Sequence, residues 1–199
     1  MSNSGVVTYR GEKSFDLELC GLKRTLPVVR ISDSAWIASF VMLGDVELIE
    51  RAADTIASML APGFDVIVVP EAKAIPLAHA VARRTGRSYR VIRKSSKAYF
   101  SGEISMPVDS ITTRSAQRLY LDGSDARMLA GAKVCLVDDV VSTGSTLSAS
   151  AALLTKAGAH IHQIATVLIE GDAAPDAFAK YAPNPLVHLA TIPLFVTSG

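Results

Sequence analysis

The sequence is poor in cysteine and in excess charge, and it contains no long hydrophobic run. Its 199 residues include two cysteines, too few for a disulfide framework and without a metal-type partner at close spacing. Lys and Arg total 20 against 19 Asp and Glu, so the net charge of +1 gives no general attraction to nucleic acid or an anionic membrane. No window approaches the ~18 uninterrupted apolar residues of a spanning helix, and the N-terminal residues do not resemble a secretory signal. These absences predict a cytoplasmic protein that binds neither nucleic acid nor membrane.

Low-complexity segments and internal repeats are also absent, which argues against extensive disorder and against a solenoid fold. Hydrophobic residues make up 49% and charged residues 20%, a composition typical of globular proteins. Because a domain usually has roughly 100–200 residues, the length predicts one domain over residues 1–199. We divide it into a hood or N-terminal cap at 5–45, a core at 46–170 and a C-terminal tail at 171–199.

The hood carries the pattern of short β-strands. Val6–Tyr9, Phe15–Leu19 and Arg24–Ile31 are expected to be strands, and the second of them alternates at period two. Cys20 and Gly21 are expected to form the turn between the second and third strands. A small β-rich unit is therefore predicted ahead of the core.

The core alternates strands with helices. The expected strands are 64–69, 89–92, 133–137 and 161–169, and the expected helices are 45–60, 75–84 and 145–157. Asp45 is placed to cap the first helix, with Val46 on its apolar face, and Gly86 and Gly158 are placed to end the other two. Repeated strand–helix–strand units predict an α/β fold with a mainly parallel sheet flanked by helices.

Residues 94–123, between these units, show no helical period, and we interpret them as a long mobile loop with weak β segments at 110–113 and 117–121. A loop of this length inside a compact domain is usually functional and often a lid. The alternative is a protruding hairpin without a function. The tail at 171–199 is expected to add a strand or two at the edge of the sheet.

The most informative stretch runs from 134 to 146, where a buried strand ends in two adjacent acids and a short loop leads into a helix. Backbone N–H groups and hydroxyls at the start of a helix suit a phosphate, and a glycine there permits close approach. Ionised Asp138 and Asp139 only accept hydrogen bonds, which suits the hydroxyls of a diol. The expected phosphate-binding residues are Val141, Ser142, Thr143, Gly144, Ser145 and Thr146.

A phosphate cradle beside a diol clamp predicts a ribose 5-phosphate site. In the alternative interpretation, the two acids only end a strand, and Ser145 or Thr146 only caps a helix. Neither a Walker A loop nor a dinucleotide-binding glycine pattern is present.

At these residues the sequence resembles the type I phosphoribosyltransferases, whose motif has four hydrophobic residues, two acids, two further residues and Thr-Gly-x-Thr. Residues 70–74 (Pro-Glu-Ala-Lys-Ala) resemble the pyrophosphate-contacting loop of the adenine and xanthine enzymes. Residues 93–97 resemble their Arg-Lys-x-x-Lys, and 169–170 match their Ile-Glu. The resemblance extends from about 26 to about 172 and implies the type I phosphoribosyltransferase fold.

The resemblance implies transfer of the 5-phosphoribosyl group from phosphoribosyl pyrophosphate to a purine base, with release of pyrophosphate. It implies Mg²⁺ bound through the substrate, with Asp138 or Asp139 as the side chains that could also contact the ion, and it implies a homodimer. The residues given catalytic roles are Asp138, Asp139, Arg93 and Lys97. Further substrate contacts are assigned to Glu71, Ala72, Lys73, Lys94 and Glu170. The alternative is a regulatory protein that binds phosphoribosyl pyrophosphate without turnover.

The purine is expected under the hood, where Trp36 and Phe40 either stack on the ring or pack in the hood's own core. Gly171 stands where xanthine enzymes of this branch carry a lysine, so a donor to a 6-oxo group is missing. Adenine is therefore favoured, ahead of xanthine or another 6-oxopurine. Ala74 in place of the usual glycine and Ala98 in the mobile loop are further departures from the family pattern.

Overall fold

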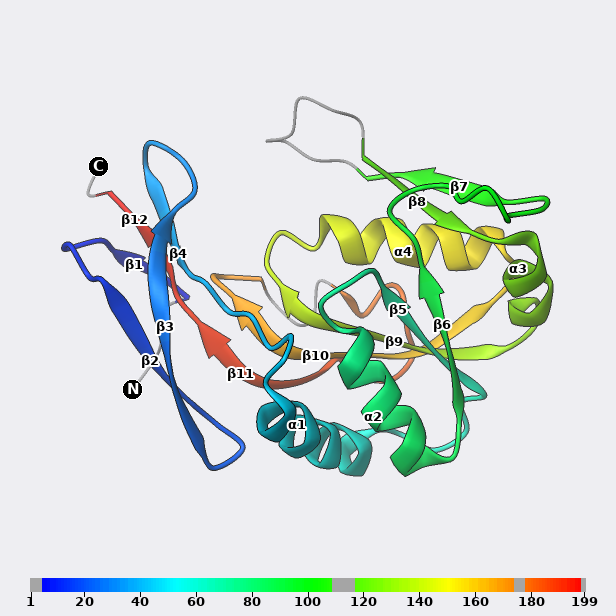
Figure 1. Cartoon of the computed structure of the whole chain (residues 1–199), viewed down its shortest axis with the longest axis horizontal. Coiled ribbons are helices and arrows are strands. Elements are labelled where there is room, and N and C mark those ends of the chain that lie inside the picture. Colours follow the sequence, from blue (N-terminus) through cyan, green and yellow to red (C-terminus); the bar gives the residue numbers. More distant parts are fainter. Residues whose placement is uncertain (1–4, 109–116, 174–177, 198–199) are drawn as a thin grey trace.

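The computed structural model describes residues 5–108, 117–173 and 178–197, which form a core sheet and a hood sheet (Figure 1). The core sheet is parallel throughout, with the strand order β11-β10-β9-β5-β6. Its strands are β5 (Val66–Pro70), β6 (Ser88–Ile92), β9 (Lys133–Val141), β10 (His160–Glu170) and β11 (Val187–Ile192). The predicted parallel α/β architecture is confirmed.

Helices cover both faces of the core sheet. These are α1 (Val46–Met59), α2 (Ile75–Thr85), α3 (Gly123–Leu129) and α4 (Ser145–Lys156). Along β5, Ile67 and Val69 pack with α1 and α2, whereas Val66 and Val68 pack with α4. Because successive side chains of a strand point to opposite faces, a wholly apolar strand can be buried on both sides. This explains the continuous β-branched run of β5.

The predicted helix boundaries agree with the structure, but one expectation about the buried face of α1 is wrong. The Asp45 carboxylate caps α1 by accepting a hydrogen bond from the Leu48 N–H at 3.1 Å, and Gly86 ends α2 in the left-handed region with φ 65°. Val46, expected on the buried face, is 69% exposed. The buried face of α1 begins at Leu48 and Ile49, so the first turn of the helix is left uncovered.

The hood sheet combines strands from both ends of the chain. It consists of β1 (Val6–Thr8), β2 (Ser14–Leu19), β3 (Leu22–Arg30), β4 (Ala35–Ala38) and β12 (Leu194–Val196), in the order β1-β12-β4-β3-β2. The three strands expected in the hood are confirmed, and β4 was not expected. In the tail, β11 lies at the edge of the core sheet as expected. The expectation of an edge position is wrong for β12, which pairs with strands on both of its sides inside the hood.

Ion pairs join the hood to the core. Arg24 of β3 contacts the Asp45 carboxylate with two nitrogens, at 2.7 and 3.1 Å, and Glu47 at 3.1 Å. The Arg24 guanidinium holds the pKa of Asp45 below its ordinary value. The same carboxylate therefore begins α1 and anchors the hood to it.

Part of the expected loop at 94–123 is a hairpin. Strands β7 (Ile104–Pro107) and β8 (Arg118–Leu121) pair antiparallel, and α3 follows directly. Leu119 and Leu121 are fully buried against the side of the core that α4 covers, which fixes β8 on the core. The expected strand at 117–121 is confirmed, the one at 110–113 lies outside the described residues, and the mobility of the segment stays a prediction. A strand as short as β7 gave no detectable period in the sequence.

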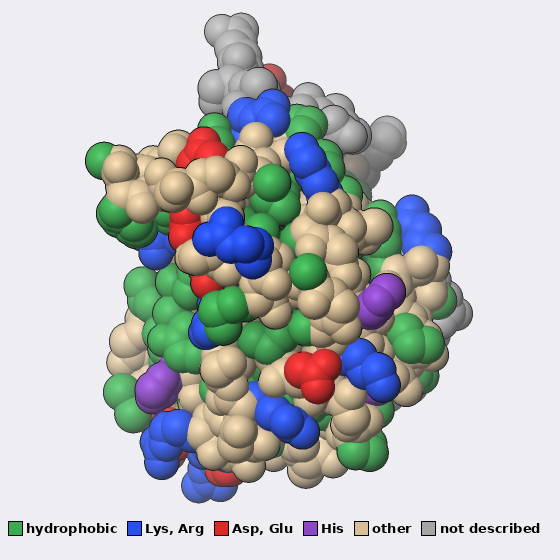
Figure 2. Space-filling view, turned by 90° about the vertical axis from the view of Figure 1, so that its right-hand side faces the viewer, with side chains coloured by type: hydrophobic (Ala, Val, Ile, Leu, Met, Phe, Trp, Pro, Cys, Tyr) green, Lys and Arg blue, Asp and Glu red, His purple; other side chains and the backbone are tan. Residues whose placement is uncertain are grey.

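In the described ranges, no helix is both long and apolar enough to cross a membrane. Figure 2 shows the end of the core that lies away from the hood, where Lys and Arg side chains are dispersed among polar and hydrophobic ones.

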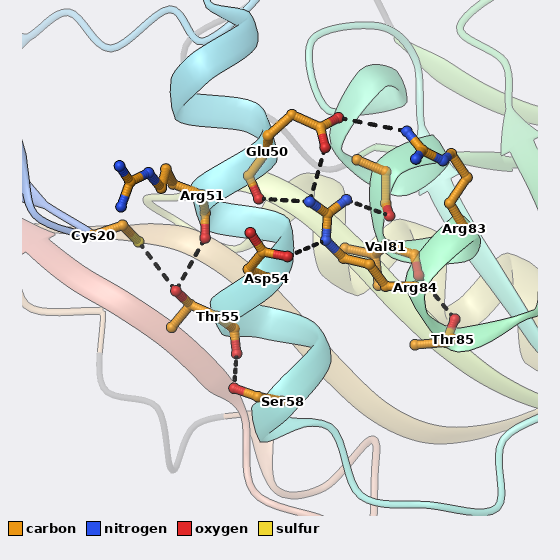
Figure 3. Close-up of polar contacts among 11 residues, drawn as sticks. Cys20, Glu50, Arg51, Asp54, Thr55, Ser58, Val81, Arg83, Arg84 and Thr85 are labelled. Atoms are coloured by element: carbon orange, nitrogen blue, oxygen red, sulfur yellow. Dashed lines mark hydrogen bonds and ion pairs between the residues drawn. The ribbon is translucent and has the colours of Figure 1, made fainter.

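Arg84 links α1 to α2 (Figure 3). Its guanidinium contacts Asp54 at 2.6 Å and Glu50 at 2.8 Å, and it donates to the backbone carbonyls of Ala80 and Glu50. The side chain is 20% exposed, so these bonds are partly shielded from water. Charge-assisted hydrogen bonds in such an environment are stronger than ion pairs on an open surface.

Arg84→Ala should lower the free energy of unfolding by about 1–3 kcal/mol, because two carboxylates on α1 lose their partner. Arg83→Ala is the matched control. Arg83 is 66% exposed and reaches Glu50 only at 4.0 Å, so its loss should cost less than about 0.5 kcal/mol. Urea denaturation of both variants tests this, and equal losses would contradict it.

Candidate active site

Two acidic residues lie near the carboxyl end of the central strand β9. The expectation that the strand ends at these acids is wrong, because β9 continues to Val141. Asp139 is 8% exposed and Asp138 is partly buried. The Asp139 N–H donates to the Asp138 carboxylate at 2.9 Å, and the Thr166 hydroxyl donates to the Asp139 carbonyl at 3.1 Å. The Asp139 Oδ2 atom is buried and has no hydrogen-bond partner among the described residues.

Burial sets the electrostatics of these acids. Desolvation raises the pKa of Asp138, the negative charge of Asp139 raises it further, and Lys94 opposes the shift. Glu170, at the end of β10, is 8% exposed, and desolvation raises its pKa as well, opposed by a hydrogen bond from Ser142. Desolvated carboxyl groups such as these are stabilised by any ligand that supplies hydrogen-bond donors or positive charge.

The loop after β9 surrounds a cavity of about 120 Å³, lined by Asp138 and by residues 140–147. The loop leads into α4. The first backbone N–H groups of a helix lack helical partners and are suited to binding an anion. Gly144 has φ 76°, as its expected role requires, and an added Cβ would lie 2.8 Å from the ring of Phe178. The Thr143 and Ser145 hydroxyls are 3.0 Å apart. This loop has the size and donors of a phosphate cradle.

The expected cations follow β5 and β6, and the structure brings some of them together. Arg93 Nε is 3.5 Å from the Glu71 carboxylate, and Lys94 lies close enough to Asp138 to affect its pKa. Lys97 donates to Ser95 of its own loop at 2.7 Å. Lys73 and Ala72 are exposed in the turn after β5. Parallel strands end at one edge of a sheet, so all these segments share the edge that faces the hood (Figure 1).

The hood aromatics are engaged within the hood. Trp36 stacks on Tyr9 with ring centroids 4.0 Å apart, and Arg30 lies 5.9 Å from the Trp36 ring. Phe40 is 5% exposed in the core cluster that joins hood and helices. Phe40 is therefore assigned to the alternative, packing in the core. Trp36 is half-buried with one ring face stacked on Tyr9, so its role in stacking on a base stays a prediction.

Gly171 is explained by its backbone conformation, because its φ of 67° lies in the left-handed region. Its carbonyl oxygen lies against Gly5, where an added Cβ would be 1.8 Å from that oxygen. The start of β1 thus touches the end of β10 directly, and only glycine at position 5 permits this approach. An apolar cavity of about 170 Å³ adjoins the contact, lined by Gly5, Val7, Phe15, Thr191, Ile192, Pro193 and Phe195.

Sequence reasoning missed three contacts around the candidate site. They are the hydrogen bond from Thr166 to Asp139, the packing of the Phe178 ring on Gly144, and the close approach of Gly5 and Gly171. Each joins residues far apart in the chain. Only the glycine at 144 gave a local signal. In the described ranges, no group of three or more His, Cys, Asp or Glu side chains could hold a metal ion.

Sequence comparison identifies related proteins over most of the chain. A family model described as "Phosphoribosyl transferase domain" matches residues 42–183. A hypoxanthine/guanine phosphoribosyltransferase of Methanothermococcus okinawensis is 37% identical over 144 residues, covering 72% of this chain and 75% of the relative. One from Methanococcus voltae is 39% identical over 137 residues, covering 68% and 69%.

Solved structures agree at the level of the fold. The adenine phosphoribosyltransferase of Thermoanaerobacter pseudethanolicus superposes with a TM-score of 0.63 and 23% sequence identity, covering 74% of this chain and 82% of that one. The adenine phosphoribosyltransferase of Leishmania donovani gives 0.63 at 16% identity, covering 90% and 76%. The expected type I phosphoribosyltransferase fold is confirmed.

Gly144→Ala should destabilise the protein more than Gly158→Ala. Both glycines have φ near 77°, at 76° and 78°, so both variants carry the left-handed penalty of about 1–2 kcal/mol. Only at Gly144 does the new methyl group meet a ring at 2.8 Å, whereas at Gly158 the nearest atoms are 3.8 Å away. Thermal unfolding of both variants measures the difference, and Phe178→Leu should relieve part of it. Equal destabilisation would contradict the packing of Phe178 on the loop.

Asp138→Asn should stabilise the ligand-free protein, increasingly so at higher pH. A carboxyl with a raised pKa in the folded state destabilises that state once the unfolded chain ionises, so the loss grows as pH rises from about 4 through the raised pKa. Asparagine does not ionise and can still accept the Asp139 N–H bond.

The measurement is the melting temperature from pH 5 to pH 9. The advantage of Asp138→Asn over the natural protein should widen with pH. Asp33→Asn, on an exposed hood residue, should run parallel to the natural protein. Parallel curves for Asp138→Asn as well would show that Asp138 is not held in a desolvated state.

Proposed function

This chain belongs to the phosphoribosyltransferase family of pentosyltransferase enzymes, and on this premise we propose that it transfers the 5-phosphoribosyl group of phosphoribosyl pyrophosphate to a purine base. The bond from the anomeric carbon to pyrophosphate oxygen breaks, and pyrophosphate leaves with the electron pair. A bond to a ring nitrogen of the base forms, and that nitrogen loses its proton to solvent. The observation that carries this proposal is the buried acid pair beside a phosphate-sized loop cavity.

The acid pair is proposed to bind the ribose. Asp139 Oδ2 is a buried acceptor that has no donor among the residues described, and a ribose hydroxyl would supply one. The transition state of such a transfer has positive charge on the sugar, as in glycoside chemistry. Asp139 would stabilise this charge, and so would Asp138 once the positive charge beside it lowers its raised pKa. Burial would strengthen the effect because the local dielectric is low.

The loop at 141–146 is proposed to hold the 5-phosphate, with its backbone N–H groups and hydroxyls as donors. Arg93, Lys94, Lys97 and Lys73 are proposed to receive the pyrophosphate. Their positive charge stabilises a leaving group more as its negative charge develops. The Lys97 amino group would have to leave Ser95 to take part.

Mg²⁺ fits this site as an ion held mainly by substrate. The described residues contain no cage of three or more ligating side chains, and the acid pair has one unpartnered oxygen. Mg²⁺ commonly keeps one or two carboxylates and binds substrate phosphates and waters with its other positions. When bound, the ion would neutralise pyrophosphate charge, and Asp138 or Asp139 would be the protein groups beside it. A homodimer in the cytoplasm is also proposed, from the family resemblance and from two free cysteines.

For the base, two observations favour different candidates. Adenine is supported by the absence of a donor at Gly171 and by the acceptor at Glu170, which suits an amino group. Hypoxanthine or guanine is supported by the names of relatives that are 37% and 39% identical. The base is proposed to lie between Glu170 and the hood. The apolar cavity at Ile192 adjoins this place, because Ile192 pairs with Glu170 in the sheet.

The test is release of pyrophosphate from phosphoribosyl pyrophosphate and Mg²⁺, with adenine, hypoxanthine, guanine, xanthine and uracil offered separately. Release is expected with a purine and not with uracil. The double variant Asp138→Asn/Asp139→Asn should lose at least about 100-fold in rate, because charge stabilisation by both carboxylates is removed. Tight binding of phosphoribosyl pyrophosphate with no release from any base would overturn the proposal and favour a non-catalytic regulatory protein.

A further inference from the structure

Glu71 lies where two segments of the site meet. It is the first residue after β5, and its N–H donates to the Ile92 carbonyl at 2.8 Å, so the β5–β6 ladder extends to it. Its carboxylate accepts the Lys94 N–H at 2.9 Å and lies 3.5 Å from Arg93 Nε. One carboxylate thus contacts both the backbone and a side chain of the segment that carries the proposed pyrophosphate cations.

The Arg93 side chain faces Glu71 from a fixed backbone. Its backbone is fixed by paired hydrogen bonds with Tyr120, at 2.9 and 2.8 Å, so the side chain is the part left to turn. Arg93 Nε is buried without a hydrogen bond, and in the described part of the chain Glu71 is the one charged group paired with the guanidinium. The side chains are 30% and 23% exposed, so their attraction is less screened than on an open surface.

The chemistry of a carboxylate argues against direct contact with pyrophosphate. Both groups are negative and both lack donors, so close approach would be repulsive. Cations, in contrast, gain from a fixed partner, because a preorganised guanidinium loses less freedom when it binds an anion. Glu71 would therefore contribute to pyrophosphate binding indirectly, by orienting Arg93 and Lys94.

We propose that Glu71 is a positioning residue for the reaction and not a substrate ligand. It holds the Arg93 guanidinium and the start of the loop at 94–97 in the orientation that receives pyrophosphate. The inference rests on the proposed function, since it assumes that Arg93 contacts the leaving group.

When Glu71 is replaced, the proposal and a simple charge effect predict opposite changes in the affinity for pyrophosphate. Removing a negative charge beside Arg93 should by itself strengthen attraction for pyrophosphate. Loss of positioning should instead weaken pyrophosphate binding. It should also slow the breaking of the bond between the sugar and the leaving pyrophosphate. The direction of the change in affinity therefore separates the two.

The experiment compares Glu71→Gln, Glu71→Ala, Arg93→Ala and the double variant Glu71→Ala/Arg93→Ala. The measurements are kcat and KM for phosphoribosyl pyrophosphate, and calorimetric affinity for Mg²⁺-pyrophosphate. Glu71→Gln keeps an acceptor for the Lys94 N–H, so it should lose about 3–10-fold in kcat/KM, and Glu71→Ala about 10–50-fold. Both should bind pyrophosphate more weakly. In the Arg93→Ala background, Glu71→Ala should cost less than about twofold more, because its effect acts through Arg93.

Glu18→Gln is the matched control, since it removes an equally charged side chain from an exposed hood pair with Lys23 and should leave every constant unchanged. Tighter pyrophosphate binding by Glu71→Gln or Glu71→Ala, or effects of Glu71 and Arg93 that multiply, would overturn the proposal. If Glu71→Ala does not fold, the same question is decided by Glu71→Gln, Arg93→Ala and the double variant Glu71→Gln/Arg93→Ala. A natural protein that releases no pyrophosphate with any base would overturn the proposed function instead, and the calorimetric comparison would still report on Glu71.

Discussion

Two neighbouring carboxyl groups are held largely out of water near the end of the central strand, and the rest of the site is arranged around this constraint. Desolvation and the negative charge of Asp139 both disfavour the ionised form of Asp138. The protein supplies only part of the compensation, through the Asp139 N–H on Asp138 and the field of Lys94. One oxygen of Asp139 has no donor among the described residues. A site that remains incomplete in the free protein is able to gain the missing interactions from a substrate, at the expense of stability before the substrate arrives.

The parallel topology determines where the polar groups collect. Strands β5, β9 and β10 are closed off from water along most of their lengths by helices and neighbouring strands, so polar residues are tolerated mainly where the strands end. In a parallel sheet these ends share one edge. The acids of β9, the cations after β6 and Glu170 of β10 therefore converge without any short spacing between them in the chain. Glu71 lies among the cations because β5 is the direct neighbour of β6.

The hood is attached to this edge at several points. The chain leaves β11 of the core and enters β12 of the hood almost immediately, and β1 touches the end of β10 through the Gly5–Gly171 contact. On the other side, Arg24 binds the carboxylate that caps α1. These attachments fix the hood over the carboxyl edge, and they occupy residues whose identity would otherwise suggest roles in ligand binding. Gly171 is favoured by its positive φ, whatever the base may require.

The sequence by itself determined the parallel α/β core, most element boundaries, and the position of the loop at 141–146 and of the acids before it, because these depend on local period, capping and a contiguous motif. The period of β5, the cap at Asp45 and the left-handed glycine at 144 act within a few residues. Tertiary structure alone decided that β12 enters the hood sheet, that β8 is buried, that Phe40 is buried in the core while Trp36 stacks on Tyr9, and that Glu71 faces Arg93. The reason is that burial and pairing between distant segments depend on which surfaces meet in space, and no local pattern of side chains records that.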